Sequence, residues 1–138
     1  MASFLLSKNV FTYCFFMTGT LLNCAVVEVL QRVTSLEDIS EQDAKQLSSV
    51  FGTISSAGRE LISSDQPASI YKFVPKWNKM EEMKLLLTAR LREIADRWAD
   101  GKGPLASEFT AAELKQLIRA LFQNTEKRAA VLASITDL

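Results

Sequence analysis

The sequence contains no histidine, and its 138 residues include only two cysteines, three prolines and five glycines. Without histidine the chain lacks the side chain that most often serves as a general base and as a metal ligand. Sixteen basic and sixteen acidic residues leave no net charge. A neutral chain without a basic block argues against direct binding of nucleic acid or of an anionic membrane. We therefore expect no cofactor, no metal site and no direct contact with nucleic acid.

The small number of glycines and prolines, together with 48% apolar residues, indicates a folded domain rather than a disordered chain. No segment alternates between apolar and polar residues for long enough to suggest a sheet, whereas apolar residues three and four apart recur. The predicted fold is all-α, with four or five helices packed as an elongated antiparallel bundle.

The longest predicted helix begins at Asn78, because Glu81 follows three residues later, and ends at Gly101. Pro104 prevents the helix from resuming. Residues 69–75 precede this helix and are predicted to be extended or irregular, because their final proline disfavours helical backbone in the residue before it. The apolar stripe expected along the long helix is Met80, Met83, Leu87, Leu91, Ile94 and Trp98.

Other helix starts follow from capping residues. Residues 110–113 form a complete Thr-x-x-Glu capping box, and residues 40–43 form a near capping box. A last helix is expected to start at Asn124 or Thr125.

The amino-terminal segment has no charged residue from Asn9 to Val27. One interpretation is a core helix, since its apolar spacing continues past the charged residues Glu28 and Arg32. The alternative is a signal or membrane-anchoring segment, which would make the chain a small membrane-anchored or secreted helical protein. The stripe expected for the core helix is Leu22, Ala25, Val26, Val29, Leu30 and Val33.

The two cysteines, Cys14 and Cys24, lie in this same helical stretch. Ten residues of helix separate two Cα atoms by about 15 Å, which is beyond the reach of a disulfide. We interpret them as buried, reduced thiols in a protein of the reducing cytosol.

Motifs for chemistry are not found. The Asp-Gly-Lys-Gly of residues 100–103 lacks both the earlier glycine and the following Ser or Thr of a phosphate-binding loop. The serines have no neighbouring base, and the acidic residues alternate with basic ones as they do on a solvated helix face. The sequence thus predicts a protein that is not an enzyme and has no small-molecule substrate.

Several unusual stretches resemble the C-terminal region of the zeste-white-ten family of kinetochore and vesicle-tethering proteins. They occur in the family's order and cover residues 17–138 as one helical domain, while residues 1–16 form an apolar segment unlike the family. An alternative start, a spliced isoform or a partial gene model would each explain that difference. The matching stretches are Gly19–Asn23, Val33–Ser40, Val74–Trp77, Asp96–Leu105 and Leu117–Ala130.

The resemblance implies a non-enzymatic scaffold subunit, similar in architecture to the C-terminal domain of multisubunit tethering factors. It implies a place in the kinetochore complex of Rod and Zwilch, which recruits dynein and spindle-checkpoint proteins in mitosis. In interphase it implies a tether on the cytosolic face of the endoplasmic reticulum, for vesicles returning from the Golgi. The expected partner is a large helical-solenoid subunit, Rod or its endoplasmic-reticulum counterpart. Membrane association would then be peripheral and through a complex.

Three arginines in the matching stretches are candidates for the partner interface: Arg97, Arg119 and Arg128. Arginine is favoured at interfaces because its planar donor fork suits paired acceptors. Arg97 also follows Glu93 at the i,i+4 spacing that favours an ion pair within one helix.

Overall fold

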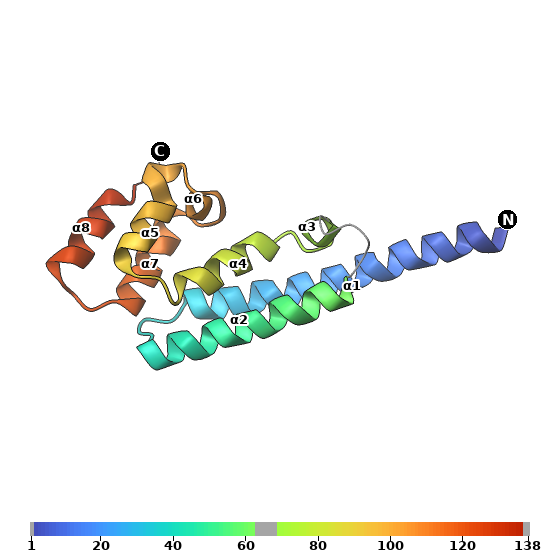
Figure 1. The fold of residues 1–138 in the computed structure, drawn as a ribbon, viewed down its shortest axis with the longest axis horizontal. Helices are drawn as coiled ribbons and strands as arrows, with labels where there is room; N and C mark the ends of the chain where they lie inside the picture. Colours follow the sequence, from blue (N-terminus) through green and yellow to red (C-terminus); the bar gives the residue numbers. More distant parts are fainter. Residues whose placement is uncertain (1, 63–68, 137–138) are drawn as a thin grey trace.

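The computed structural model describes residues 2–62 and 69–136, and within these ranges the chain forms helices and no strand (Figure 1). This confirms the all-α prediction, although the helices are more numerous and shorter than expected. They are α1 (Ala2–Thr34), α2 (Glu41–Leu61), α3 (Ser69–Phe73), α4 (Trp77–Leu86), α5 (Leu91–Trp98), the 3-10 turn η1 (Ala99–Gly101), α6 (Pro104–Glu108), α7 (Ala111–Leu121) and α8 (Glu126–Ser134).

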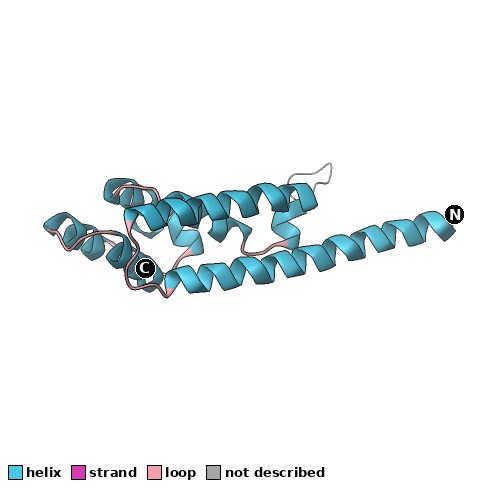
Figure 2. Ribbon diagram, turned by 90° about the horizontal axis from the view of Figure 1, so that it is seen from below, coloured by secondary structure: helices cyan, strands magenta, loops and turns pink. Residues whose placement is uncertain are grey.

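The helices form two groups. In the first group, which we call the body, α1 and α2 run antiparallel and α3 and α4 pack against them (Figure 1). The second group, the head, contains α5 to α8 and lies at the end of the body opposite the amino terminus. The first half of α1 projects beyond the other helices (Figure 2). The bundle is therefore elongated, as expected, but antiparallel packing of long helices is confined to the body.

The turn between α1 and α2 is fixed to the head. Ser40 is the N-cap of α2, and its hydroxyl oxygen accepts a hydrogen bond from the backbone N–H of Asp43 at 3.1 Å. Ile39 is buried, and its N–H donates to the carbonyl oxygen of Ala120 in α7 at 2.9 Å. The near capping box thus sets the start of α2 where the sequence predicts it.

Helix α1 uses most of the predicted stripe. Val26, Leu30 and Val33 are buried, and Leu22 and Val29 pack partly buried against the same core, whereas Ala25 is exposed. Among the described residues, no helix combines the length and the apolar character that crossing a membrane requires. The burial of this stripe favours the core-helix interpretation of the segment.

The prediction for the two cysteines is wrong in one respect, their burial. Cys14 and Cys24 are both free thiols, but both are exposed rather than buried. The reason is that both cysteines lie outside the buried stripe of α1, which packs against α3 and α4.

Two further predictions were wrong. Residues 69–73 form the short helix α3 rather than an extended or irregular segment, and the N–H of Val74 still donates to the carbonyl of Ile70 at 2.8 Å. The conformational restriction from the following proline therefore acts only on the residue immediately before it. The predicted long helix from residue 78 is also two helices, α4 and α5, with a break at residues 87–90.

The junction of the three long body helices depends on Trp77, which is 1% exposed at the start of α4. Its ring lies against Gly58 of α2, where a Cβ atom would stand 2.7 Å from two ring carbons and 3.0 Å from a methyl of Leu22 in α1. The adjacent N–H of Lys76 donates to the side-chain oxygen of Asn23 at 2.9 Å. Glycine at position 58 therefore allows the indole to contact two helices at once.

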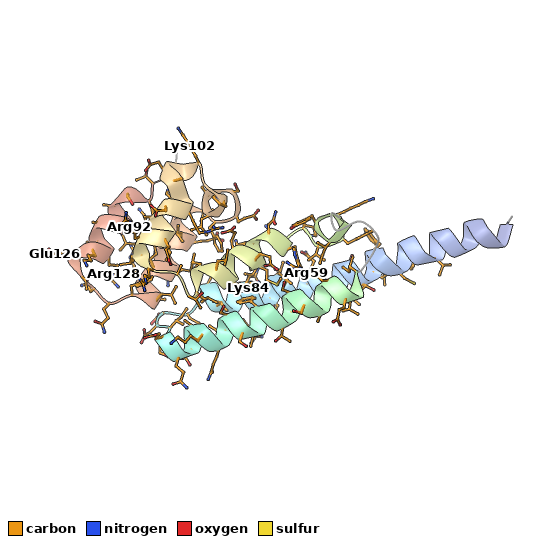
Figure 3. All side chains as sticks on the ribbon, in the orientation of Figure 1. Arg59, Lys84, Arg92, Lys102, Glu126 and Arg128 are labelled. Atoms are coloured by element: carbon orange, nitrogen blue, oxygen red, sulfur yellow. The ribbon has the colours of Figure 1, made fainter. Side chains whose placement is uncertain are left out.

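A polar cluster closes the seam between α2 and α4. Glu81 accepts hydrogen bonds from Ser55 and from Lys84, the latter at 2.9 Å, and Arg59 approaches to 3.7 Å (Figure 3). Burial by itself would raise the pKa of Glu81, but the two hydrogen bonds and the two cations lower it below its ordinary value. The carboxylate is thus ionised and paired at neutral pH.

In the head, backbone conformation, glycine, proline and capping residues determine where the helices begin and end. Helix α5 stops at Trp98, and residues 99–101 all have positive φ, of 46°, 54° and 84° in chain order. A Cβ at Gly103 would lie 2.0 Å from the carbonyl oxygen of Arg97, so only glycine fits there. Pro104 was predicted to prevent the helix from resuming. In the structure it instead occupies the first turn of a new short helix, α6. The capping box at Thr110 and the cap at Thr125 start α7 and α8, which confirms both predictions.

Two glycines of α2 allow a matched test of the Trp77 contact. We expect Gly58→Ala to lower the free energy of unfolding by about 1–3 kcal/mol, because the new methyl would collide with a buried ring. Gly52→Ala, with nothing within 4 Å of its Cβ, should raise it by about 0.5–1 kcal/mol. Urea denaturation measures both values. Equal stabilisation by the two substitutions would contradict the packing described here.

Candidate interaction surface

The break between α4 and α5 is built by a capping interaction that the sequence pattern conceals. The N–H of Arg90 donates to a side-chain oxygen of Glu93 at 2.7 Å, which satisfies a donor at the start of α5. Before it, the N–H groups of Thr88 and Ala89 donate to carbonyls three residues earlier, at 3.3 Å each, so α4 ends in a tightened turn. Glu93 is therefore engaged as a cap rather than paired with Arg97.

Arg97 instead forms an ion pair across the break. Its Nε donates to Glu82 Oε2 at 3.1 Å and its Nη2 to the same oxygen at 2.7 Å. The side chain of Glu82 is 14% exposed and that of Arg97 is 35% exposed. A two-point contact of this kind fixes orientation as well as distance, so the pair sets the angle at which α5 leaves α4.

Arg128 is also used within the head. Its Nη1 donates to the carbonyl oxygens of Phe122, at 2.9 Å, and of Arg119, at 3.3 Å. These carbonyls lie at the C-terminal end of α7, where unpaired acceptors and the helix dipole favour a cation. Arg128 thus holds the first turn of α8 against the end of α7 (Figure 3, where Arg128 is labelled).

Arg119 differs from the other two arginines. Arg119 is exposed, and within the described ranges its guanidinium group forms no hydrogen bond or ion pair. The structure therefore brings Arg119 and Arg128 together at the end of α7, while Arg97 is committed to Glu82. A role for the three arginines in binding a partner stays a prediction, and Arg119 is the one whose side chain is available for it.

A groove of about 450 Å³ lies where the body meets the head. Its walls come from the start of α2, from the break between α4 and α5, and from the end of α7. Leu91, Leu121 and Phe122 are only partly buried there, so apolar surface remains open in the groove. The residues that line it are Ile39, Glu41, Ala44, Lys45, Leu87, Thr88, Ala89, Arg90, Leu91, Leu121 and Phe122.

The charges around the groove are unequal. On one side Glu41 and Lys45 pair with each other at 2.9 Å. On the other side Arg90 is exposed, and its guanidinium has no partner among the described residues. The groove therefore combines an apolar lining with one unpaired cation, Arg90, the N-cap residue of α5. Arg119 lies in the last turn of α7, two residues before the lining residue Leu121.

The groove was not predictable from the sequence, because its central wall exists only where the predicted long helix breaks. A signal was present: an acidic residue stands three positions after Arg90, the spacing by which Glu93 caps α5. The apolar stripe runs through the break with helical spacing and hid that signal.

The remaining buried charges serve the fold. Lys79, in α4, pairs with Glu113 of α7 at 3.1 Å. Burial would raise the pKa of Glu113, but hydrogen bonds from the Thr110 N–H and from Lys79 lower it below its ordinary value. In the part of the chain that the structure describes, no three acidic or cysteine side chains gather as metal ligands would.

These features define an all-α domain in which polar contacts fix the helix junctions and a groove lies between body and head. A family model of the ZW10 C-terminal helical domain matches residues 5–135, and the chain belongs to that family. The matched range includes residues 5–16, which belong to the apolar segment that was expected to be unlike the family.

Curated relatives agree with this assignment. The chain is 48% identical over 131 residues to the mouse (Mus musculus) centromere/kinetochore protein zw10 homolog, a match that covers 89% of this chain and 17% of that protein. It is 38% identical over 115 residues to centromere/kinetochore protein zw10 of Drosophila melanogaster, covering 83% of this chain and 16% of the relative. The chain thus spans about a sixth of the length of these relatives.

The Glu82–Arg97 pair can be tested by a double-mutant cycle with Arg97→Ala and Glu82→Gln. We expect a coupling energy of about 1 kcal/mol, because each substitution removes the same two-point contact while Arg97 stays partly solvated. Chemical denaturation of the four proteins gives the value. A coupling near zero would show that the pair does not hold α5 against α4.

Proposed function

We propose that this domain is a non-enzymatic scaffold module that acts in a kinetochore complex. The observation that carries the proposal is the family match over residues 5–135, joined by relatives whose names place them at the centromere and kinetochore. The geometry is compatible with it, since the conspicuous side chains fix helix junctions instead of forming a site for chemistry. Rigid junctions keep a binding surface in one orientation, which a scaffold requires.

We further propose that the partner is a large helical-solenoid subunit of the Rod type, and that it docks on the groove and on Arg119. The groove offers apolar surface to an incoming helix, and Arg90 and Arg119 are cations without internal partners. A partner helix with apolar residues flanked by acidic ones would complement both features.

The resemblance found in the sequence also supports a second setting, an endoplasmic-reticulum tether for vesicles returning from the Golgi. In that setting the counterpart solenoid of the tether would occupy the same surface, and the domain would reach the membrane through its complex. The domain would then be cytoplasmic in both settings, at the kinetochore in mitosis and at the reticulum in interphase.

Charge reversal at Arg119 tests the docking surface. We expect Arg119→Glu to weaken capture of the Rod-type partner at least about tenfold, because an acidic side chain would face acidic residues of the partner. Helicity should not change, since the side chain of Arg119 has no internal partner. Pull-down by the tagged chain at several concentrations measures the effect.

Lys72→Glu provides the matched control, because Lys72 is an exposed cation on α3, far from the head (Figure 1). It should leave capture unchanged. Equal capture by the wild-type chain and Arg119→Glu would contradict the proposed surface, whereas loss of capture by both variants would point to a nonspecific charge effect.

A further inference from the structure

A second groove, of about 370 Å³, lies beside the turn between α1 and α2, and we call it the turn groove. One wall is the loop before α2, and the other is the face of α2 that carries Asp43, Leu47 and Val50, spaced four and three apart. Two of its apolar side chains are open to solvent, since Val50 is 49% exposed and Leu36 is 41% exposed. The residues that line it are Leu36, Asp38, Ile39, Asp43, Gln46, Leu47 and Val50.

The rim of the turn groove is acidic. Asp38 and Asp43 line the groove, and Glu37 is the exposed neighbour of Asp38. Asp43 accepts a hydrogen bond from the Ser40 hydroxyl at 2.7 Å, but none of the three carboxylates forms an ion pair within the described residues. The N-terminus of α2 contributes only about half a positive charge. The negative charge of the rim is therefore left without a matching cation.

This combination of surfaces determines the kind of helix that fits. An apolar floor accepts the apolar stripe of an amphipathic helix, and an acidic rim favours lysine and arginine on either side of that stripe. An acidic helix or an anionic membrane would be repelled. The turn groove thus differs from the groove between body and head, where the unpaired charge is the cation Arg90.

A second copy of this chain does not offer such a helix. The exposed apolar residues of α1 lie between Asn9 and Val27, where there is no charge. Helices α5, α7 and α8 carry exposed cations, but their large apolar residues pack in or against the core. In α4 the cations Lys79 and Lys84 are paired with Glu113 and Glu81.

A polypeptide joined to the start of α1 would also enter far from the turn groove. Helix α1 has 33 residues, and its first turn lies at the end of the body opposite the turn into α2 (Figure 1). At 1.5 Å per residue the two ends of α1 are about 50 Å apart. A separate protein is therefore the occupant that fits the groove best.

We propose that the turn groove binds a basic amphipathic helix of another protein. The apolar stripe of that helix lies on Leu36, Leu47 and Val50, and its cations lie beside Asp38 and Asp43. Ile39 lines both grooves, so the two docking surfaces adjoin. The domain then holds two helices of opposite charge side by side, which goes beyond the single Rod-type partner proposed above.

A labelled helical peptide of about 18 residues, built from leucine at helical spacing and lysine elsewhere, tests the proposal. Fluorescence anisotropy with the 138-residue chain measures its dissociation constant. We expect Asp38→Lys to raise this constant at least about tenfold, because a cation would then face the lysines of the peptide. Glu60→Lys is the matched control, since Glu60 is an exposed, unpaired acid at the far end of α2. It should leave the constant unchanged.

A second pair of variants tests the apolar floor without changing the charge. We expect Leu36→Ser to raise the dissociation constant at least about threefold, because the peptide would lose apolar contact area. Leu85→Ser is the matched control, since Leu85 is 46% exposed in α4 and does not line the turn groove. Arg119→Glu should leave peptide binding unchanged, so the Rod-type surface and the turn groove can fail separately.

Four results would overturn the proposal. The first is no binding of the leucine–lysine peptide, and the second is equal binding by the wild-type chain and Asp38→Lys. The third is equal weakening by Asp38→Lys and Glu60→Lys, which would mean attraction by net charge alone. The fourth is displacement of the labelled peptide, with equal affinity, by a matched leucine–glutamate peptide, because the acidic rim would then select nothing.

Discussion

The angle between α4 and α5 is the constraint on which the arrangement of body and head depends. Two interactions set it: the Glu93 carboxylate caps the start of α5, and Arg97 reaches back to Glu82 in α4. If the two helices were continuous, α5 could not turn into the head, and the groove would lose its central wall. A pair of local polar contacts thus determines a long-range feature of the fold.

Most charged side chains near the core join helices to one another. Glu113 caps α7 and also pairs with Lys79 of α4, and Arg128 holds α8 against the end of α7. Such contacts order the helix junctions at modest net energy, since each desolvation cost is offset by a fixed partner. The guanidinium groups of Arg90 and Arg119, by contrast, form no ion pair or hydrogen bond within the described residues.

Features of this fold are predictable from the sequence where the interaction that determines them is local. Capping residues act within one helical turn, so the starts of α7 and α8 were predicted at Thr110 and Thr125. The break at residues 87–90 was missed because the residues on both sides of it are apolar at helical spacing. The short helix α3 was missed because the effect of Pro75 on its neighbour was extended too far along the chain.

The candidate site was predictable only in part. The family resemblance pointed to three arginines, but Arg97 meets an acidic partner fifteen residues away, which no helical spacing reveals. The exposure of Cys14 and Cys24 was also hidden, because an uncharged helix does not show in sequence which of its two faces packs. Both failures concern contacts between helices, which depend on the tertiary arrangement.

Backbone chemical shifts of residues 84–94 in solution test the central claim, that a true break separates α4 from α5. The structure predicts helical Cα shifts up to Leu86, their loss over residues 88–90, and their return from Leu91 onward. Helical shifts without interruption from residue 84 to residue 94 would contradict the account, because body, head and groove all follow from that break.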